Sequence, residues 1–147
     1  MFDYEEYEKE CDKIRETNNE YLDLFEEDLQ SAGLAPKTIR KHISNVDFYI
    51  NEYVLREEPR PMEDGTGMID MFLGYFFIRK CMWSTPGTIK STASSIKKFY
   101  KCMLDHSKLD KKYYDCFCDD IKENLEQWQD ECAIYNDPDA PNPFDWF

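Results

Sequence analysis

The sequence predicts an all-α protein, a compact bundle of about five helices. Apolar residues recur at a spacing near 3.6 in several long segments, and no segment shows the alternation typical of a half-buried strand. Five of the seven prolines lie within residues 59–61 and 138–143, where we expect connections. With ten Phe, ten Tyr and three Trp, a chain of 147 residues has enough apolar side-chain area for the core of one domain.

Two amphipathic helices are expected in the first 55 residues. The first covers residues 3–32, with acidic side chains opposite its apolar face and Gly33 where a helix would end. Its apolar period lapses at 17–19, so we expect either one long helix or two with a break there. The second covers residues 36–55, starts at Pro36 and carries an apolar stripe formed by Ile39, Ile43, Val46, Ile50, Tyr53 and Val54.

The central part of the chain is predicted to be a connection followed by a buried helix. Residues 56–67 are rich in charge, Pro and Gly, as is typical of a connection. Residues 68–83 are apolar on nearly all sides, which predicts a short helix in the middle of the bundle.

The next helix is expected within residues 84–108 and has two distinct faces. Ser84 or Thr85 can cap it, and Pro86 can occupy its first turn. Its core stripe consists of Ile89, Ala93, Ile96, Tyr100, Met103 and Leu104. The opposite face carries only ammonium and hydroxyl groups, from Lys90, Ser91, Ser94, Lys97, Lys98 and Lys101.

A last amphipathic helix is predicted at about residues 112–133, with an acidic outer face. Residues 135–147 have three prolines and no apolar period, which predicts an extended tail with aromatic residues at 144, 146 and 147. We therefore expect a single helical domain over residues 1–134 and a tail over 135–147.

Charge is distributed unevenly along this acidic chain. The net charge is −13, yet residues 79–112 carry nine Lys or Arg against two Asp or Glu, a net of +7. Residues 1–32 and 113–147 each have a net charge of −9. A basic middle between acidic ends predicts one localised face that binds a polyanion. The cations near the start of the second helix agree with this, because the helix dipole disfavours them at that end.

Residues 20–108 resemble the N-terminal core-binding domain of tyrosine recombinases of the phage-integrase type, a SAM-like four-helix unit. The likeness is carried by Leu34–Ala35–Pro36–Lys37–Thr38–Ile39, which opens the second helix, and by Ile89 through Leu104 with its Ile-Lys-Lys-Phe-Tyr centre. In that family the domain forms one half of a clamp around duplex DNA.

The resemblance implies a DNA-binding module associated with integration or recombination. Carried over position by position, it points to contacts with double-stranded DNA from Lys37, Thr38, Arg40, Lys41, Lys90, Ser94, Lys97, Lys98 and Lys101. Since these residues include a single Arg for bidentate reading of bases, we expect contacts mainly to the DNA backbone.

Catalysis by this chain is not expected. Strand cleavage in the family requires a separate domain with an H-x-x-R box and a nucleophilic Tyr, and neither His42 nor His106 begins H-x-x-R. We expect no cofactor and no metal. Cys116-x-Cys118, taken with Cys132 and His106, would be the alternative zinc set, but two thiols separated by one residue point roughly 200° apart on a helix.

The acidic ends allow three interpretations: a cover that folds over the lysine face and mimics DNA, a docking surface for a basic partner, or simple solubility. The alternative function is accordingly a protein-interaction adaptor that uses the acidic surfaces and the tail at 136–147. No segment has the roughly 18 apolar residues of a membrane span. We interpret the six cysteines as reduced core thiols. Together with the lack of a membrane span, this predicts a cytoplasmic protein without a membrane partner.

Overall fold

The computed structural model describes residues 3–139 of the chain. Within this range every regular element is a helix and there is no strand, so the all-α prediction is confirmed. The elements in chain order are α1 (Tyr4–Ser31), α2 (Pro36–Asp47), η1 (Phe48–Tyr53), η2 (Met62–Gly67), α3 (Ile69–Met71), η3 (Phe72–Phe76), α4 (Phe77–Lys80), α5 (Pro86–Asp105) and α6 (Lys111–Asn136).

α1 is one unbroken helix, so the expected alternative of a break at 17–19 is wrong. The apolar period lapses there because the inward position is held by Asn18, which is 1% exposed. Its side-chain amide donates to the Ile50 carbonyl over 3.3 Å and to Asn51 Oδ1 over 2.8 Å. A buried polar side chain whose amide nitrogen donates two hydrogen bonds therefore replaces the apolar residue that the pattern leads one to expect.

α1 ends in a glycine cap. Gly33 has a φ of +81°, in the left-handed region that favours glycine. The Gly33 and Leu34 amides bond back to the Gln30 and Leu29 carbonyls over 3.0 and 3.2 Å, as in a Schellman-type ending. This cap turns the chain directly into α2, which starts at Pro36 as predicted.

The second helix continues from α2 into η1, a π-helical turn, and two buried tyrosines then hold the connection that follows. The Tyr49 hydroxyl donates to the Gly65 carbonyl over 2.5 Å, and the Tyr100 hydroxyl donates to the Met62 carbonyl over 2.7 Å. The expected connection at 56–67 thus contains a short 3-10 helix, η2. Burial raises the pKa of both tyrosines well above its usual range, so both hydroxyls stay protonated donors.

The predicted buried helix at 68–83 is found at residues 69–80 as the run α3, η3 and α4, but its burial was overestimated. Phe72, Leu73 and Phe77 lie in the core, whereas one side of this helix and the residues just after it reach solvent. Met71, Tyr75, Met82 and Trp83 are 61, 52, 101 and 58% exposed. The helix therefore lies at the edge of the bundle, with one apolar face uncovered.

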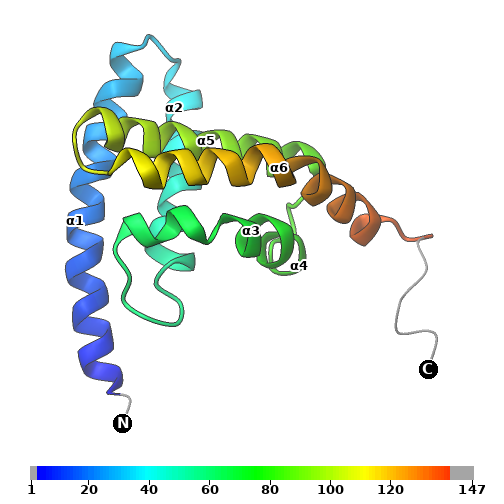
Figure 1. Cartoon of the computed structure of the whole chain (residues 1–147), viewed down its shortest axis with the longest axis horizontal. Coiled ribbons are helices and arrows are strands. Elements are labelled where there is room, and N and C mark those ends of the chain that lie inside the picture. Colours follow the sequence, from blue (N-terminus) through cyan, green and yellow to red (C-terminus); the bar gives the residue numbers. More distant parts are fainter. Residues whose placement is uncertain (1–2, 140–147) are drawn as a thin grey trace.

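α5 and α6 run side by side in opposite directions, joined by a short connection at residues 106–110 (Figure 1). Thr85 caps α5 in a capping box with Thr88, as the Ser84 or Thr85 prediction allowed. α6 extends to Asn136, whose side-chain amide donates to the Ser84 carbonyl over 2.7 Å. The expected boundary at 134/135 is thus two residues early, because this bond ties the last turn of α6 to the start of α5.

A single apolar cluster takes residues from all the long helices, with Phe25, Tyr49, Phe99, Phe117 and Trp128 among its largest buried side chains. Four of the six cysteines are buried and all six are free thiols, consistent with the interpretation of the cysteines as mainly core thiols. None of the described helices combines the length and the apolar character needed to cross a membrane. The tail aromatics at 144, 146 and 147 lie outside the described residues.

Candidate nucleic-acid interface

All nine residues predicted to contact DNA are exposed to solvent. Five lie on α5 and four lie in the first two turns of α2. α2 and α5 pack directly against each other, so the two basic segments that are far apart in the sequence lie on neighbouring helices (Figure 1).

The lysines of α5 form a stripe along its outer face, at Lys90, Lys97, Lys98 and Lys101. Among residues 3–139, no carboxylate oxygen lies within 4.0 Å of the ammonium groups of Lys90, Lys97 or Lys98. Lys101 differs, because its Nζ lies 2.9 Å from Asp105 Oδ1, one turn along the helix. The lysine face was expected to be free of acids, and at this end that expectation is wrong.

A hydrogen-bonded joint fixes α2 against α5 beneath the lysines. The Ser95 hydroxyl lies 2.7 Å from His42 Nδ1 and accepts a bond of 3.0 Å from the Asn45 side-chain amide. Burial, followed by repulsion from Lys98 and Lys41, lowers the pKa of His42. One lysine from each helix therefore acts on the same imidazole, so Lys41 and Lys98 contribute to one positive region across the joint.

A shallow groove of about 430 Å³ runs between α5 and the end of α1. Ser94, Lys97, Lys98 and Lys101 line one side of it, and Leu34 with the last turns of α1 lines the other. Four of the nine predicted residues thus border one concave surface. Its floor is apolar, from Phe25 and Leu29, and its rim carries three lysines together with Asp28 and Asp105.

The start of α2 adds hydrogen-bond donors near this groove. No side chain caps the helix, because Ala35 stands at the capping position, and Leu34 just before it lines the groove. The first amides of a helix without a cap remain available to an anion, and the helix dipole favours negative charge at that end. Lys37 and Thr38 are exposed in this first turn.

Arg40 does not join this surface. It borders a second groove between α1 and α2, together with the acidic residues Asp23, Glu26 and Asp47. The sequence pattern placed Arg40 and Lys41 together as neighbours, but consecutive helical residues point about 100° apart. The structure therefore places Arg40 on a different groove from Ser94, Lys97, Lys98 and Lys101.

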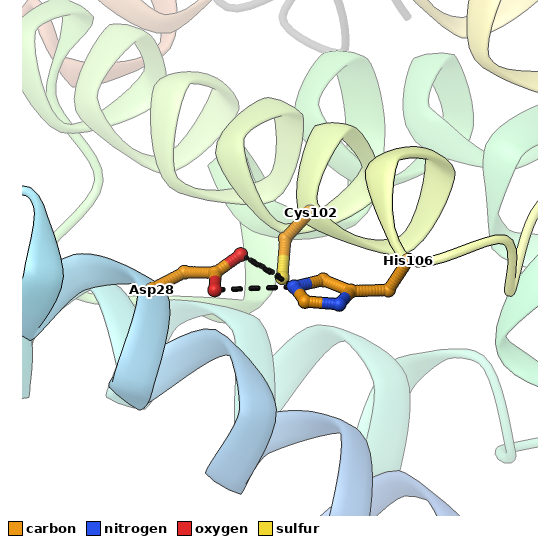
Figure 2. A group of neighbouring side chains, drawn as sticks. All are labelled: Asp28, Cys102 and His106. Carbon is orange, nitrogen blue, oxygen red and sulfur yellow. Dashed lines mark hydrogen bonds and ion pairs between the residues drawn. The ribbon is translucent and has the colours of Figure 1, made fainter.

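One cluster of reactive side chains was missed from the sequence. Asp28, near the end of α1, meets Cys102 and His106 at the end of α5 (Figure 2). The hydrogen bond from the Cys102 thiol, followed by that with His106, lowers the pKa of the Asp28 carboxyl against the effect of burial. Burial and then the bond to Asp28 raise the pKa of the Cys102 thiol far above its usual range.

The sequence could have indicated two of the three residues in this cluster. Cys102 and His106 are four residues apart on a predicted helix, a spacing that places two side chains on one face. The alternative zinc set considered from the sequence instead combined His106 with Cys116, Cys118 and Cys132. Among the described residues, those three thiols belong to no group of candidate metal ligands.

An apolar surface lies at the other end of the molecule, over α4 and the end of α6. Besides the exposed residues of the 69–83 region, Ile134 and Tyr135 of α6 are 62 and 55% exposed. The Arg79 guanidinium lies 4.2 Å from the centre of the Tyr75 ring and 5.6 Å from that of Tyr135, which joins the two helices by cation–π contacts.

Comparison with protein-family models, with curated proteins and with solved structures found no match to this chain. The resemblance to the core-binding domain of tyrosine recombinases therefore stays a prediction from the sequence.

Proposed function

We propose that this chain is a non-catalytic module that binds the phosphate backbone of double-stranded DNA through α5 and the first turns of α2. One observation carries the proposal. Lys41, Lys97 and Lys98 are exposed, have no carboxylate partner among residues 3–139, and lie across a joint between two packed helices.

The electrostatics support a polyanion as the ligand. The chain contains 31 Asp and Glu, which are numerous enough to pair with every lysine. Among residues 3–139, however, the lysines on the outer face of α5 have no carboxylate partner except at Lys101. Burial and then repulsion from Lys98 and Lys41 lower the pKa of His42, which agrees with positive potential at the same place. Negatively charged phosphate groups would relieve this repulsion. Each phosphate that a lysine neutralises also releases counterions from DNA, which favours binding.

The kind of contact follows from the side chains. Lys ammonium groups act as point charges toward phosphate, and Ser94 and Thr38 are short donors beside them. The only Arg among the nine predicted residues borders the acidic groove between α1 and α2, so the groove of α5 has no guanidinium for bidentate reading of guanine. We therefore expect binding with little sequence preference, as half of a clamp around a duplex.

The test is fluorescence anisotropy of a labelled DNA duplex with the full chain at about 50 and 200 mM salt. The double variant Lys97→Glu/Lys98→Glu is expected to bind more than about 10-fold more weakly at the lower salt. The slope of its log affinity against log salt concentration should be less steep by about 2, since about one unit of slope is lost with each phosphate contact.

The matched control is Lys13→Glu/Lys122→Glu. Both residues are exposed, on α1 and α6, and neither borders the groove of α5, so this variant changes the net charge equally at another place. An equal loss of affinity in both variants would show that only net charge matters and would refute the proposed interface.

The second candidate is the protein-interaction adaptor, which the exposed apolar surface around Tyr75, Trp83 and Tyr135 favours. Large exposed aromatic patches are typical of protein interfaces. If the full chain does not bind DNA even at the lower salt, this candidate leads. It then requires a purified partner that binds the native chain and not the Tyr75→Ser/Trp83→Ser variant.

A further inference from the structure

The cluster of Asp28, Cys102 and His106 brings three different ligand atoms to one point. Asp28 Oδ2 lies 3.0 Å from Cys102 Sγ and 2.9 Å from His106 Nε2, and Asp28 Oδ1 lies 3.1 Å from the same nitrogen. One oxygen of the carboxylate, the sulfur and the ring nitrogen all lie within 4.8 Å of one another. Figure 2 shows Asp28 directed from α1 at the imidazole, with the thiol beside both.

The positions in the fold explain this convergence. Cys102 and His106 are one turn apart at the end of α5, so their side chains leave the helix on the same side. Asp28 approaches from the last turns of α1, which pack across that end of α5. Two rigid helices therefore supply the three side chains, and no loop rearrangement is needed to assemble them.

We propose that Asp28, Cys102 and His106 bind a zinc ion, with the carboxylate, the thiolate and the imidazole as three of its ligands. These are the three side-chain types that zinc takes in proteins. In a tetrahedral site with ordinary bond lengths, neighbouring ligand atoms are roughly 3.3–3.5 Å apart. The Asp28 carboxylate oxygens lie 2.9–3.1 Å from Cys102 Sγ and His106 Nε2, so these pairs reach that range with shifts of a few tenths of an ångström. Sγ and Nε2 lie within 4.8 Å of each other.

The chemistry of the donors selects the metal. A thiolate and an imidazole favour zinc and similar borderline cations, whereas magnesium and calcium require oxygen ligands. Binding converts the Cys102 thiol to thiolate and releases its proton to solvent. The thiolate and the carboxylate then carry two negative charges, which a divalent cation neutralises.

The ion has access from solvent and room for a further ligand. Cys102 is 5% exposed, but the side chains of Asp28 and His106 are 40 and 36% exposed, so the outer side of the cluster is open. With three protein ligands, the fourth position of the tetrahedron falls to water. The proposal concerns metal binding alone and does not rest on the proposed DNA-binding function.

The experiment is a titration of the reduced full chain with Zn²⁺ by calorimetry, and with Co²⁺ followed by its absorption spectrum. We expect one Zn²⁺ per chain, a thiolate-to-cobalt charge-transfer band and no binding of Mg²⁺ at the same concentrations. His106→Gln should weaken Zn²⁺ binding more than about 100-fold, since even outer partners of metal ligands typically contribute 10- to 100-fold. Cys102→Ser should abolish the charge-transfer band.

The matched controls are Cys116→Ser and His42→Gln, which change a thiol and an imidazole elsewhere, and both should leave zinc affinity unchanged. His106 is exposed, so His106→Gln tests the proposal even where substitution of the buried Cys102 prevents folding. The proposal is overturned if the native chain binds no Zn²⁺, if His106→Gln binds it as tightly as the native chain, or if Cys116→Ser removes binding.

Discussion

Gly65 shows how a single residue without a side chain supports the interior of this protein. Its carbonyl accepts the Tyr49 hydroxyl, and a Cβ atom placed on it would lie 2.4 Å from the Tyr100 hydroxyl oxygen and 3.0 Å from Tyr49 Cε2. Both rings are fully buried and hydrogen-bonded, so neither can move aside without loss of packing.

We therefore predict that Gly65→Ala lowers the free energy of unfolding by about 1–3 kcal/mol, the usual effect of overfilling a packed core. Urea denaturation followed by circular dichroism measures this change. Gly67→Ala is the matched control, because a Cβ there meets no atom within 4 Å. Equal stability of the Gly65 variant and the native protein would contradict the close approach of Tyr100.

The lysines of α5 differ in whether they have an ion-pair partner. Lys98 and Lys101 lie on the same helix face, yet Lys101 has an ion pair with Asp105 and Lys98 has none among the described residues. Exposed pairs of this kind contribute little to stability. They do, however, hold a side chain away from a ligand, so Lys97 and Lys98 are better choices than Lys101 for testing DNA contacts.

At the scale of elements, the contact of α1 with the second helix depends on the π-helical turn η1. This turn ends at Tyr53, and the last carbonyls of a helix have no partner within the helix. The side chains of α1 satisfy two of them: Asn18 donates to the Ile50 carbonyl over 3.3 Å and Arg15 Nε donates to the Asn51 carbonyl over 3.2 Å. The register between these two elements is therefore set by polar contacts inside an apolar interface.

We predict that Asn18→Ala destabilises the protein by about 1–3 kcal/mol, since it leaves a buried carbonyl and the Asn51 side chain without this donor. The neighbouring substitution Asn19→Ala is the control, because Asn19 is exposed on the same helix. Thermal unfolding of the two variants compares them directly. If Asn18→Ala unfolds at the same temperature as Asn19→Ala, the buried bonds do not stabilise the junction.

In the whole molecule, α1 and α6, which carry most of the acidic residues near the two ends of the sequence, are structural parts of the bundle. α1 places Leu22, Phe25 and Leu29 in the core, and α6 places Phe117 and Trp128 there. These helices are thus not separate covers that could be removed, and on the proposed function their acids would act on DNA through their long-range field.

This field predicts an effect of acid neutralisation that depends on salt. The variant Asp119→Asn/Glu123→Gln/Glu126→Gln removes three exposed charges from α6. Its association with DNA should be several-fold faster than that of the native chain at about 10 mM salt, where the Debye length is about 30 Å. Stopped-flow fluorescence at about 10 and 150 mM salt measures both rates, and an undiminished gain at the higher salt would argue for a local contact instead.

The features that arise within one helix follow from the amino-acid sequence. The 3.6 period, the caps at Gly33 and Thr85 and the basic stripe of α5 were all predicted from it, because helical geometry and capping act over a few residues. The apolar period did not indicate the inward position of Asn18, because Asn18 is buried through hydrogen bonds to another helix. It also did not indicate that the apolar helix at 69–80 lies at an edge.

Which helix faces meet follows from the tertiary structure. In it, Lys41 and Lys98 both act on His42, Arg40 borders an acidic groove, and Asp28 meets Cys102 across 74 residues of sequence. These relations depend on how helices remote in the chain cross and rotate against one another. Hydrophobic burial is non-directional, so the apolar stripes indicate that helices pack but leave open which polar side chains they bring together.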